Sequence, residues 1–146
     1  MTPSRKTDYA LRALLDLALN VPAGGLASTA EIARRTGSPP KFLEAILGEL
    51  RRAGLVATRR GAVGGHRLAR EPARITAGEV WRAIDGPLQL VDRGGGRLGA
   101  VEGSARAVSG LWDEVEQAVA RAADGVTIQD LAHRAEEASS VSNFSI

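Results

Sequence analysis

The side chains with the clearest chemistry in this sequence are arginines and lysines, and they gather in its first half. Residues 1–75 hold thirteen basic and six acidic side chains, a net charge of +7, while residues 76–146 hold six and eleven, a net charge of −5. Guanidinium and ammonium groups bind phosphate oxygens through charge-assisted hydrogen bonds. The imbalance therefore indicates a front half that meets a polyanion, or else a random imbalance on solvated faces.

The residue types needed for most other chemistries are missing. There is no cysteine, which argues against disulfides, thiolate zinc sites, ordinary iron–sulphur clusters and cysteine nucleophiles. Two histidines, His66 and His133, argue against a histidine-rich metal centre. No nucleophile, base and orienting group converge, and the glycines at 94–96 do not stand between a strand and a helix as a phosphate-cradling loop requires. An enzyme is thus the weakest function class, and we expect no metal and no cofactor.

Length and composition bound the fold class and the location. The 146 residues, 44% of them apolar, suffice for about one domain with a core. No apolar run approaches the roughly 18 to 20 residues of a membrane span. The polar start at residues 1–8 lacks the apolar core of a signal peptide. We therefore expect a cytoplasmic protein that does not enter membranes.

Helical periodicity begins at residues 7–19. The apolar side chains expected on one face of this helix are Leu11, Leu14, Leu15 and Ala18. Ser28 and Glu31 then form the pattern of a capping box, in which the serine accepts from a backbone N–H and the glutamate reaches back. The short helix that they open, over about residues 29–35, ends at Gly37, which can take a left-handed cap.

A second helix is predicted directly after this tight turn. Ser38 has the residue type of an N-cap, and Pro39 suits the first helical position, where its missing N–H costs nothing. The helix covers about residues 39–53, and Gly54 closes it. Its apolar side chains, which repeat at three-to-four spacing, are Phe42, Leu43, Ile46, Leu47 and Leu50.

The period then changes to that of a β-hairpin. Residues 55–60 and 66–69 predict two short strands, and the glycines of residues 61–65 admit the positive φ that a turn between them needs. Residues 76–79, Thr-Ala-Gly-Glu, repeat the capping-box pattern and open another helix, which ends at Gly86.

The second half of the chain is less regular at first. Residues 88–104 are rich in glycine and predict a mobile connector, where we would expect any sensing of a signal to reside. Helical periodicity resumes at about residue 105, with one continuous apolar stripe that ends at Gly125. A short final helix from Thr127 and a frayed, serine-rich tail at residues 139–146 follow.

The order of helix, short capped helix, tight turn, second helix and glycine-tipped hairpin is that of a winged helix-turn-helix. In this fold the second helix enters the DNA major groove with its N-terminal residues toward the bases. The inner face that holds the two helices at a steep angle comprises Ile32, Ile46, Leu47 and Leu50. Lys41, Glu44 and Ala45 are then left to face outward. A helical hairpin that never touches DNA shows the same pattern, so a protein-interaction module of this fold is the alternative.

Basic residues of the hairpin favour the DNA-binding interpretation. The arginines on or beside it are Arg59, Arg60, Arg67 and Arg70. A glycine tip lets the backbone come close to a phosphate ridge or to the minor groove. The hairpin is therefore predicted to act as a wing that contacts the duplex.

Several short motifs also occur together in this order. They are Asp8–Leu14, Glu31–Ala33, Phe42–Leu47, Leu50–Val56, Arg60-Gly61 and Gly64-Gly65. In these motifs the sequence resembles the Rrf-type winged helix-turn-helix transcription regulators, the family of IscR and CymR. The resemblance runs in register over about residues 5–87 and more loosely to about residue 135.

The resemblance implies a mainly helical fold with a small β-hairpin wing and a long C-terminal dimerisation helix. It divides the chain into a winged helix-turn-helix DNA-binding domain at 1–87, a connector at 88–104, the dimerisation helix and a short helix at 105–138, and a disordered tail at 139–146. It implies a homodimer that reads a palindromic operator in double-stranded DNA. The residues expected at the dimer contact are Val108, Leu111, Trp112, Val115 and Val119. A stripe of this kind is equally typical of an intramolecular core.

The resemblance also assigns roles to single side chains. Glu44 matches the glutamate that family members aim at base edges, where it can accept a hydrogen bond from cytosine N4; the alternative is a solvated helix charge. Arg60 matches the arginine that enters the minor groove. Arg59 and Arg67 are better interpreted as phosphate contacts. The complete predicted DNA-binding set is Ser28, Ser38, Pro40, Lys41, Glu44, Arg51, Arg59, Arg60, Gly64, Gly65, His66 and Arg67.

Departures from the family pattern concern specificity and sensing. Lys41 and Phe42 stand where the family often has a small hydroxyl residue and tyrosine, which indicates a changed operator preference. Cluster-binding members carry three cysteines in the region that corresponds to residues 91–104, and this chain has none there. We therefore expect a regulator, in particular a repressor, without a cluster, which responds to a protein partner or a small-molecule effector. Trp81 and Trp112 either line a pocket for such an effector or are ordinary core or interface aromatics.

Overall fold

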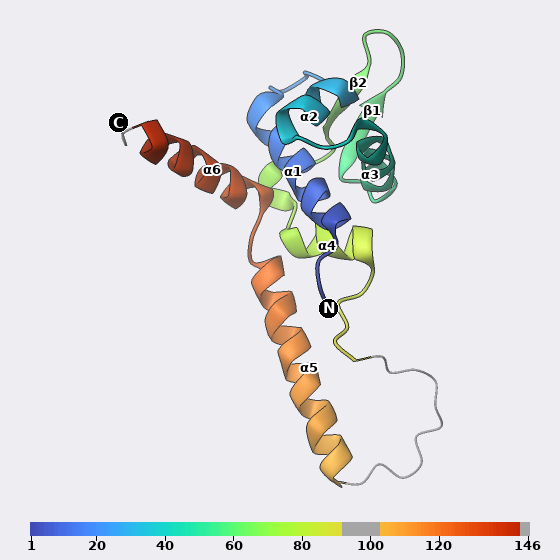
Figure 1. Ribbon diagram of the computed structural model, residues 1–146, viewed down its shortest axis with the longest axis vertical. Helices are drawn as coiled ribbons and strands as arrows, with labels where there is room; N and C mark the ends of the chain where they lie inside the picture. The colour runs from blue at the N-terminus through green and yellow to red at the C-terminus, as the bar shows by residue number, and fades with distance from the viewer. Residues whose placement is uncertain (92–102, 144–146) are drawn as a thin grey trace.

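The computed structural model describes residues 1–91 and 103–143, which form six α-helices and one two-stranded hairpin (Figure 1). In chain order the elements are α1 Arg5–Asn20, α2 Thr29–Thr36, α3 Pro40–Arg52, β1 Val56–Arg59, β2 Gly65–Leu68, the 3-10 turn η1 Pro72–Arg74, α4 Ala77–Asp85, α5 Gly103–Asp124 and α6 Ile128–Asn143. The predicted class, mainly helical with a small hairpin, is confirmed. We call residues 1–87, which hold α1 to α4 and the hairpin, the head.

The core of the head lies where α1, α2, α3 and α4 meet. Its fully buried large side chains include Leu14, Leu17, Ile32, Leu43, Ile46, Leu47, Leu50, Leu55, Ile75 and Val80, and Ile128 of α6 joins them. This confirms the predicted inner face of α2 and α3. Burying each such side chain contributes about 1.5–3 kcal/mol through the hydrophobic effect, which makes this cluster the main source of the head's stability.

The buried stripe of α1 differs from the predicted one. The residues of α1 that bury apolar side chains completely are Ala10, Ala13, Leu14 and Leu17. Leu11 and Ala18 are only partly buried. The reason is that α1 contacts α2, α3, α4 and α6 and is thus enclosed on more than one side. Its two alanines allow these neighbours to approach closely, which an amphipathic pattern does not anticipate.

The turn between α2 and α3 forms largely as its residues predict. The amide of Glu31 donates to Oγ of Ser28 at 3.1 Å, and the amide of Ser28 donates to Oε2 of Glu31 at 3.2 Å, so the capping box is complete. Gly37 ends α2 with φ of 71°, in the left-handed region. The short helix and its tight turn are therefore fixed by local chemistry.

The predicted N-cap of the second helix is wrong by one residue. Pro39 occupies the cap position and Pro40 the first helical position. A residue that precedes proline is pushed out of the helical region, and Pro39 is extended at φ −61° and ψ 129° because Pro40 follows it. Ser38 is instead buried, and its Oγ lies 2.7 Å from Oγ1 of Thr36.

The capping box predicted at the start of α4 is only half formed. The amide of Glu79 donates to Oγ1 of Thr76 at 3.1 Å, which caps the helix as expected. The carboxylate of Glu79 does not return to the cap, because it forms an ion pair with Arg70. The competing arginine comes from the segment after the hairpin, which no local pattern reveals.

The C-terminal helices are longer than predicted. α5 begins at Gly103 rather than near residue 105, and residues 92–102 of the predicted connector lie outside the described residues. α6 continues to Asn143, so the predictions of a short helix ending at 138 and of a frayed tail are wrong for residues 139–143. That serine-rich stretch holds no glycine or proline to stop a helix. Of the helices in the described ranges, none combines the length and apolar character needed to span a membrane.

Candidate nucleic-acid interface

One face of α3 is buried in the head and the other faces solvent. The exposed residues include Pro40, Lys41, Glu44, Ala45 and Arg51. The predicted outward position of Lys41, Glu44 and Ala45 is thus confirmed. The first turn of α3 contains no acidic residue, and Pro39 provides no side-chain cap. The free backbone N–H groups and the ammonium group of Lys41 therefore make this end of the helix electropositive.

α3 is held against α1 by a polar contact near its C-terminal end and by aromatic contacts near its N-terminal end. Lys6 of α1 forms an ion pair with Glu49. The rings of Tyr9 and Phe42 meet edge to face, with centroids 5.6 Å apart and planes at 83°. The guanidinium carbon of Arg12 lies 5.7 Å from the centre of the Tyr9 ring. Phe42 therefore packs toward α1 and orients α3, whose exposed face is left to Lys41 and Glu44.

The hairpin carries basic side chains on an anchored two-stranded ribbon. Its pairs run from Val56 opposite Leu68 to Arg59 opposite Gly65, and Ala27 bridges to the other edge of β2 at His66. The arginines Arg59, Arg60 and Arg67 are exposed. The wing is thus attached to the segment that leads into α2, and it presents its cations to solvent.

The predicted positive φ is found at Gly61, but Gly64 and Gly65 are required for a different reason. Only Gly61 of the three glycines at 61, 64 and 65 has positive φ, at 111°. A Cβ on Gly64 would lie 2.1 Å from the carbonyl oxygen of Arg59, and one on Gly65 would lie 2.7 Å from that of Ala27. These two positions therefore need glycine because backbones pass too close for any side chain, not because of their dihedral angles.

His66, a predicted DNA-binding residue, packs the wing onto α2. Its Nε2 lies 3.0 Å from Oγ1 of Thr29, and its Nδ1 lies 2.9 Å from Oγ1 of Thr58. Burial, with a contribution from the positive charge of Arg51, lowers the pKa of His66 below its ordinary value of 6.5. A neutral ring can donate through one nitrogen and accept through the other, so it joins both threonines at once.

Several contacts that hold the interface have no signal in the sequence. Asp16 is buried and accepts two hydrogen bonds from Arg35, at 2.8 and 2.9 Å, which join α1 to α2. Thr29 and Thr58, the partners of His66, are equally unremarkable in sequence. These pairs join residues from 8 to 37 positions apart, beyond the reach of any capping or periodicity rule.

The predicted DNA-binding residues fall into two groups. The predicted residues of α3 and the arginines of the wing are exposed, and Figure 1 shows α3 beside the hairpin. On the same wing, Gly64 and His66 are half-buried and Gly65 is buried. Ser28 and Ser38 differ, because the hydroxyl of Ser28 caps α2 and Ser38 is buried. Ser38 is therefore not available to a ligand in this conformation.

The predicted dimerisation helix projects away from the head, at the end opposite the wing (Figure 1). No described residue of α5 is buried. Its apolar stripe is open to solvent at Val108, Leu111 and Trp112, whose exposed fractions are 53%, 49% and 40%. Val115 and Val119 are half-buried. The stripe is therefore not an intramolecular core.

The two tryptophans do not share a pocket. Trp112 lines one with Val91 and Val108, whereas Trp81 lines another with Asp85 at the end of α4. The idea that both border one effector site between the head and the long helix is thus not favoured by their positions.

The fold and the exposed basic face define the chain as a winged helix-turn-helix protein. The Rrf2 family, described as iron-dependent transcriptional regulator, matches residues 3–134. The chain therefore belongs to the Rrf2 family of DNA-binding transcription regulators, and it is not an enzyme.

Relatives and solved structures agree with this assignment. The chain is 35% identical to the HTH-type transcriptional regulator CymR of Bacillus subtilis, over 90% of each chain. It is 40% identical to the regulator IscR of Cereibacter sphaeroides, over 71% of this chain and 68% of that protein. The structure of CymR, the global cysteine regulator of B. subtilis, superposes with a TM-score of 0.76 at 34% identity over 92% of this chain and 98% of that one. The structure of T. potens IscR superposes with a TM-score of 0.73 at 33% identity, over 94% of this chain and 90% of that one.

Proposed function

We propose that this chain is a homodimeric, sequence-specific repressor that binds a palindromic operator without an iron–sulphur cluster. α3 would enter the major groove of each half-site, and the wing would reach the adjacent minor groove. The residues assigned to the interface are Ser28, Pro40, Lys41, Glu44, Arg51, Arg59, Arg60, Gly64, Gly65, His66 and Arg67. Such a regulator acts where the chromosome is, so the proposal also places the protein in the cytoplasm.

The observation that carries the proposal is the charge distribution on the α3 and wing surface. Arg51, Arg59, Arg60 and Arg67 are exposed, and none forms an ion pair with a carboxylate of the described residues. Their cations are thus available to phosphates. Glu44 is the exception on this surface, an exposed acid beside Lys41. An acid that repels phosphate is best explained there by a hydrogen bond from cytosine N4.

The homodimer is supported by the exposed stripe of α5. Val108, Leu111 and Trp112 present large apolar side chains to solvent on one face of a 22-residue helix. Exposed apolar patches of this kind mark interaction surfaces. A second copy of the same helix, related by a twofold axis, would cover both stripes and give two heads for two half-sites.

The residues present do not fit an iron–sulphur cluster. Such clusters are held by cysteine thiolates, and the chain has no cysteine. In the described ranges, no group of three or more histidine, aspartate or glutamate side chains could hold a metal ion. The iron dependence in the family description therefore is not carried over to this chain, and a protein partner or small-molecule effector is proposed as its signal.

The proposal is tested by selection from a random DNA pool with purified, metal-free protein. We expect enrichment of a twofold-symmetric site, and affinity for it that falls steeply with salt because bound phosphates release counterions. Absence of any symmetric site, or affinity insensitive to salt, would refute DNA recognition by this chain. That outcome favours the second candidate, a protein-interaction module built on the same fold.

Two substitutions then assign the contacts. Arg60→Ala should cost about 1–3 kcal/mol of operator binding. Arg134→Ala, which removes one exposed cation from α6, is the matched control and should bind as the unmodified protein does. Glu44→Ala should relax the preference at one base pair of each half-site more than it weakens affinity. If the ranking of operator variants stays the same, Glu44 is a solvated helix charge.

A further inference from the structure

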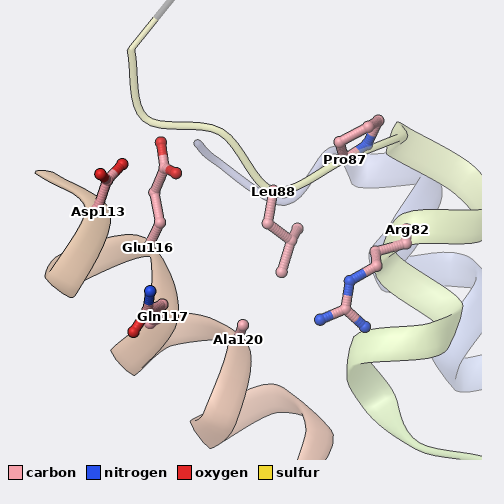
Figure 2. Close-up of a pocket in the computed structure, with 7 residues that line it drawn as sticks. All are labelled: Arg82, Pro87, Leu88, Asp113, Glu116, Gln117 and Ala120. Atoms are coloured by element: carbon pink, nitrogen blue, oxygen red, sulfur yellow. The ribbon is translucent and has the colours of Figure 1, made fainter.

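Apolar packing contributes little to the orientation of α5 relative to the head, because Val115, Val119 and Ala120 are only half-buried. α5 has no buried residue among those described. A pocket of about 670 Å³ separates it from α4, with Leu88 reaching in from the segment after α4 and Ala120 on the α5 side (Figure 2). Because α5 buries little side-chain surface against the head, other contacts are needed to fix the angle between them.

A charged pair joins the two helices at the base of α5. The guanidinium of Arg82 on α4 donates to both carboxylate oxygens of Asp124, the last residue of α5, at 2.7 and 2.8 Å. Two parallel bonds of this kind restrict rotation as well as separation. The hydrogen bonds and charge of Arg82 lower the pKa of Asp124, and those of Asp124 raise the pKa of Arg82, so both groups stay charged at neutral pH.

Gly78 provides the space that this pair needs. A Cβ at this position of α4 would lie 2.0 Å from Oδ1 of Asp124. The glycine is buried in the first turn of α4, where alanine would be the better helix former. The close approach of Asp124 explains why glycine stands there instead. Two residues of α4 thus accommodate the carboxylate of Asp124: Gly78 leaves space for it and Arg82 binds it.

The chain just beyond α5 is pinned to the head by its backbone. The amide of Ala77 donates to the carbonyl of Val126 at 2.8 Å, and the amide of Ile128 donates to that of Ile75 at 2.9 Å. Ile128 is fully buried in the core. The head therefore holds residues 126–128, which follow Asp124 after a single residue, Gly125.

We propose that Arg82 and Asp124 are positioning residues that fix the angle between the head and the dimerisation helix, and thereby the spacing of the two half-sites that the dimer reads. The inference rests on the proposed function, since it assumes a dimer through α5. α4 packs against both α3 and α5, so a change at this joint moves the recognition helix as a rigid body. The amide of Leu90 also donates to Oε1 of Glu116 at 2.6 Å, and this second contact restricts rotation of α5 relative to the head.

Selection from DNA pools with a randomised spacer between fixed half-sites tests the proposal. Asp124→Asn keeps the size of the side chain and removes its charge. We expect its preference for the best spacer length over the next one to fall about 2- to 30-fold, the range typical of mutations that alter coupling between sites. Gly78→Ala should act in the same direction, because its methyl group displaces the Asp124 carboxylate.

Glu79→Gln is the matched control. Glu79 also lies on α4 and pairs with an arginine, with side-chain exposure of 39% against 44% for Asp124, but its partner Arg70 belongs to the head. We expect it to keep the spacing preference of the unmodified protein. None of these variants removes a cation, so their effects do not arise from weaker binding to phosphate.

A second measurement tests the joint without DNA. The chain has no cysteine, so Val63→Cys at the wing tip and Arg106→Cys on α5 give two defined spin-label sites. Labelled protein is mixed with an excess of unlabelled protein, which leaves one labelled chain in each dimer. Double electron–electron resonance should show one narrow distribution of distances between the two labels. This distribution should broaden in Asp124→Asn and Gly78→Ala and stay narrow in Glu79→Gln.

The outcomes separate the two proposals. The positioning role is established if Asp124→Asn and Gly78→Ala weaken the preference for one spacer length and broaden the label distances, while Glu79→Gln does neither. Unchanged distributions in both joint variants overturn it, whatever the DNA selection gives. If the unmodified protein enriches no symmetric site, the proposed function fails, and the label distances still decide whether Arg82 and Asp124 hold the helix.

Discussion

The head and α5 are built on opposite principles. In the head, ten or more large side chains are fully buried, helices begin at hydrogen-bonded caps, and His66 ties the wing to the body. α5 is the longest helix described, yet it buries no residue and leaves its apolar stripe open. An isolated helix gains little stability from propensity alone. The core of the head, which Ile128 of α6 completes, therefore packs within one chain, whereas the stripe of α5 would be covered only by the proposed second copy.

The contrast separates two properties that a dimeric regulator must combine. Substitutions in the head should change the stability of each protomer and the shape of the DNA-binding face. Substitutions in the stripe of α5 should change association with little effect on the fold of the head. Identical leucine-to-alanine changes in the two regions make this distinction measurable.

The largest effect is expected for Leu50→Ala in α3. Leu50 is fully buried among the helices of the head, so truncation removes apolar contacts and leaves a cavity. We expect a loss of about 2–5 kcal/mol in the free energy of unfolding, measured by urea denaturation. The loss should be the same at low and high protein concentration. A loss that appears only in dilute samples would mean that the head depends on dimerisation for its fold.

The matching change in α5 should act on association instead. Leu111→Ala alters a side chain that is 49% exposed in the protomer, and Trp112→Ala removes the largest side chain of the stripe. Interface aromatics often contribute 2 kcal/mol or more to binding, so we expect Trp112→Ala to weaken self-association by about 30-fold or more. Sedimentation equilibrium measures this, and circular dichroism should show the head intact. A monomeric unmodified protein at micromolar concentration would exclude the proposed dimer.

Local patterns predicted most of the elements, and the reasons they succeeded are local. Three-to-four spacing identified the inner face of α3, and Ser28, Glu31 and Gly37 determined both ends of α2. Glycines and a change of period located the hairpin within one or two residues. Each of these signals depends on residues that are at most a few positions apart, where backbone geometry alone decides the outcome.

The predictions failed where a distant residue decided the outcome, or where a steric effect competed with a polar pattern. Glu79 does not complete its capping box because Arg70 binds it, and Ser38 is not a cap because the Pro39-Pro40 pair shifts the helix start. The pairing of Arg82 with Asp124 spans 42 positions and left no trace in spacing or periodicity. Most of the outward-facing candidate site could be predicted, but not the contacts that position it.

The smallest effect is expected for His66, whose protonation should make the free energy of unfolding of the head depend on pH. Because burial and Arg51 lower the pKa of His66 in the folded state, the unfolded chain binds the proton more readily. The free energy of unfolding should therefore be constant well above pH 6.5 and should fall as the pH drops below that value. Urea denaturation at pH 7.5 and 5.5 measures the loss, and His66→Gln should reduce it.

The control for this prediction is the second histidine, outside the head. His133 lies on α6 with its side chain 65% exposed, and it makes no contact with the wing. His133→Gln tests whether the loss belongs to the wing, because only His66 contacts Thr29 and Thr58. Protonation of His66 turns its acceptor nitrogen into a second donor, so the threonine hydroxyl that donated to it must rotate and accept instead, and a charge is placed in a half-buried site. The protection factors of the wing amides, which correct for slower intrinsic exchange at low pH, should then fall, while those of α3 stay high. Uniform loss of protection over the whole head would show that the pH effect does not begin at His66.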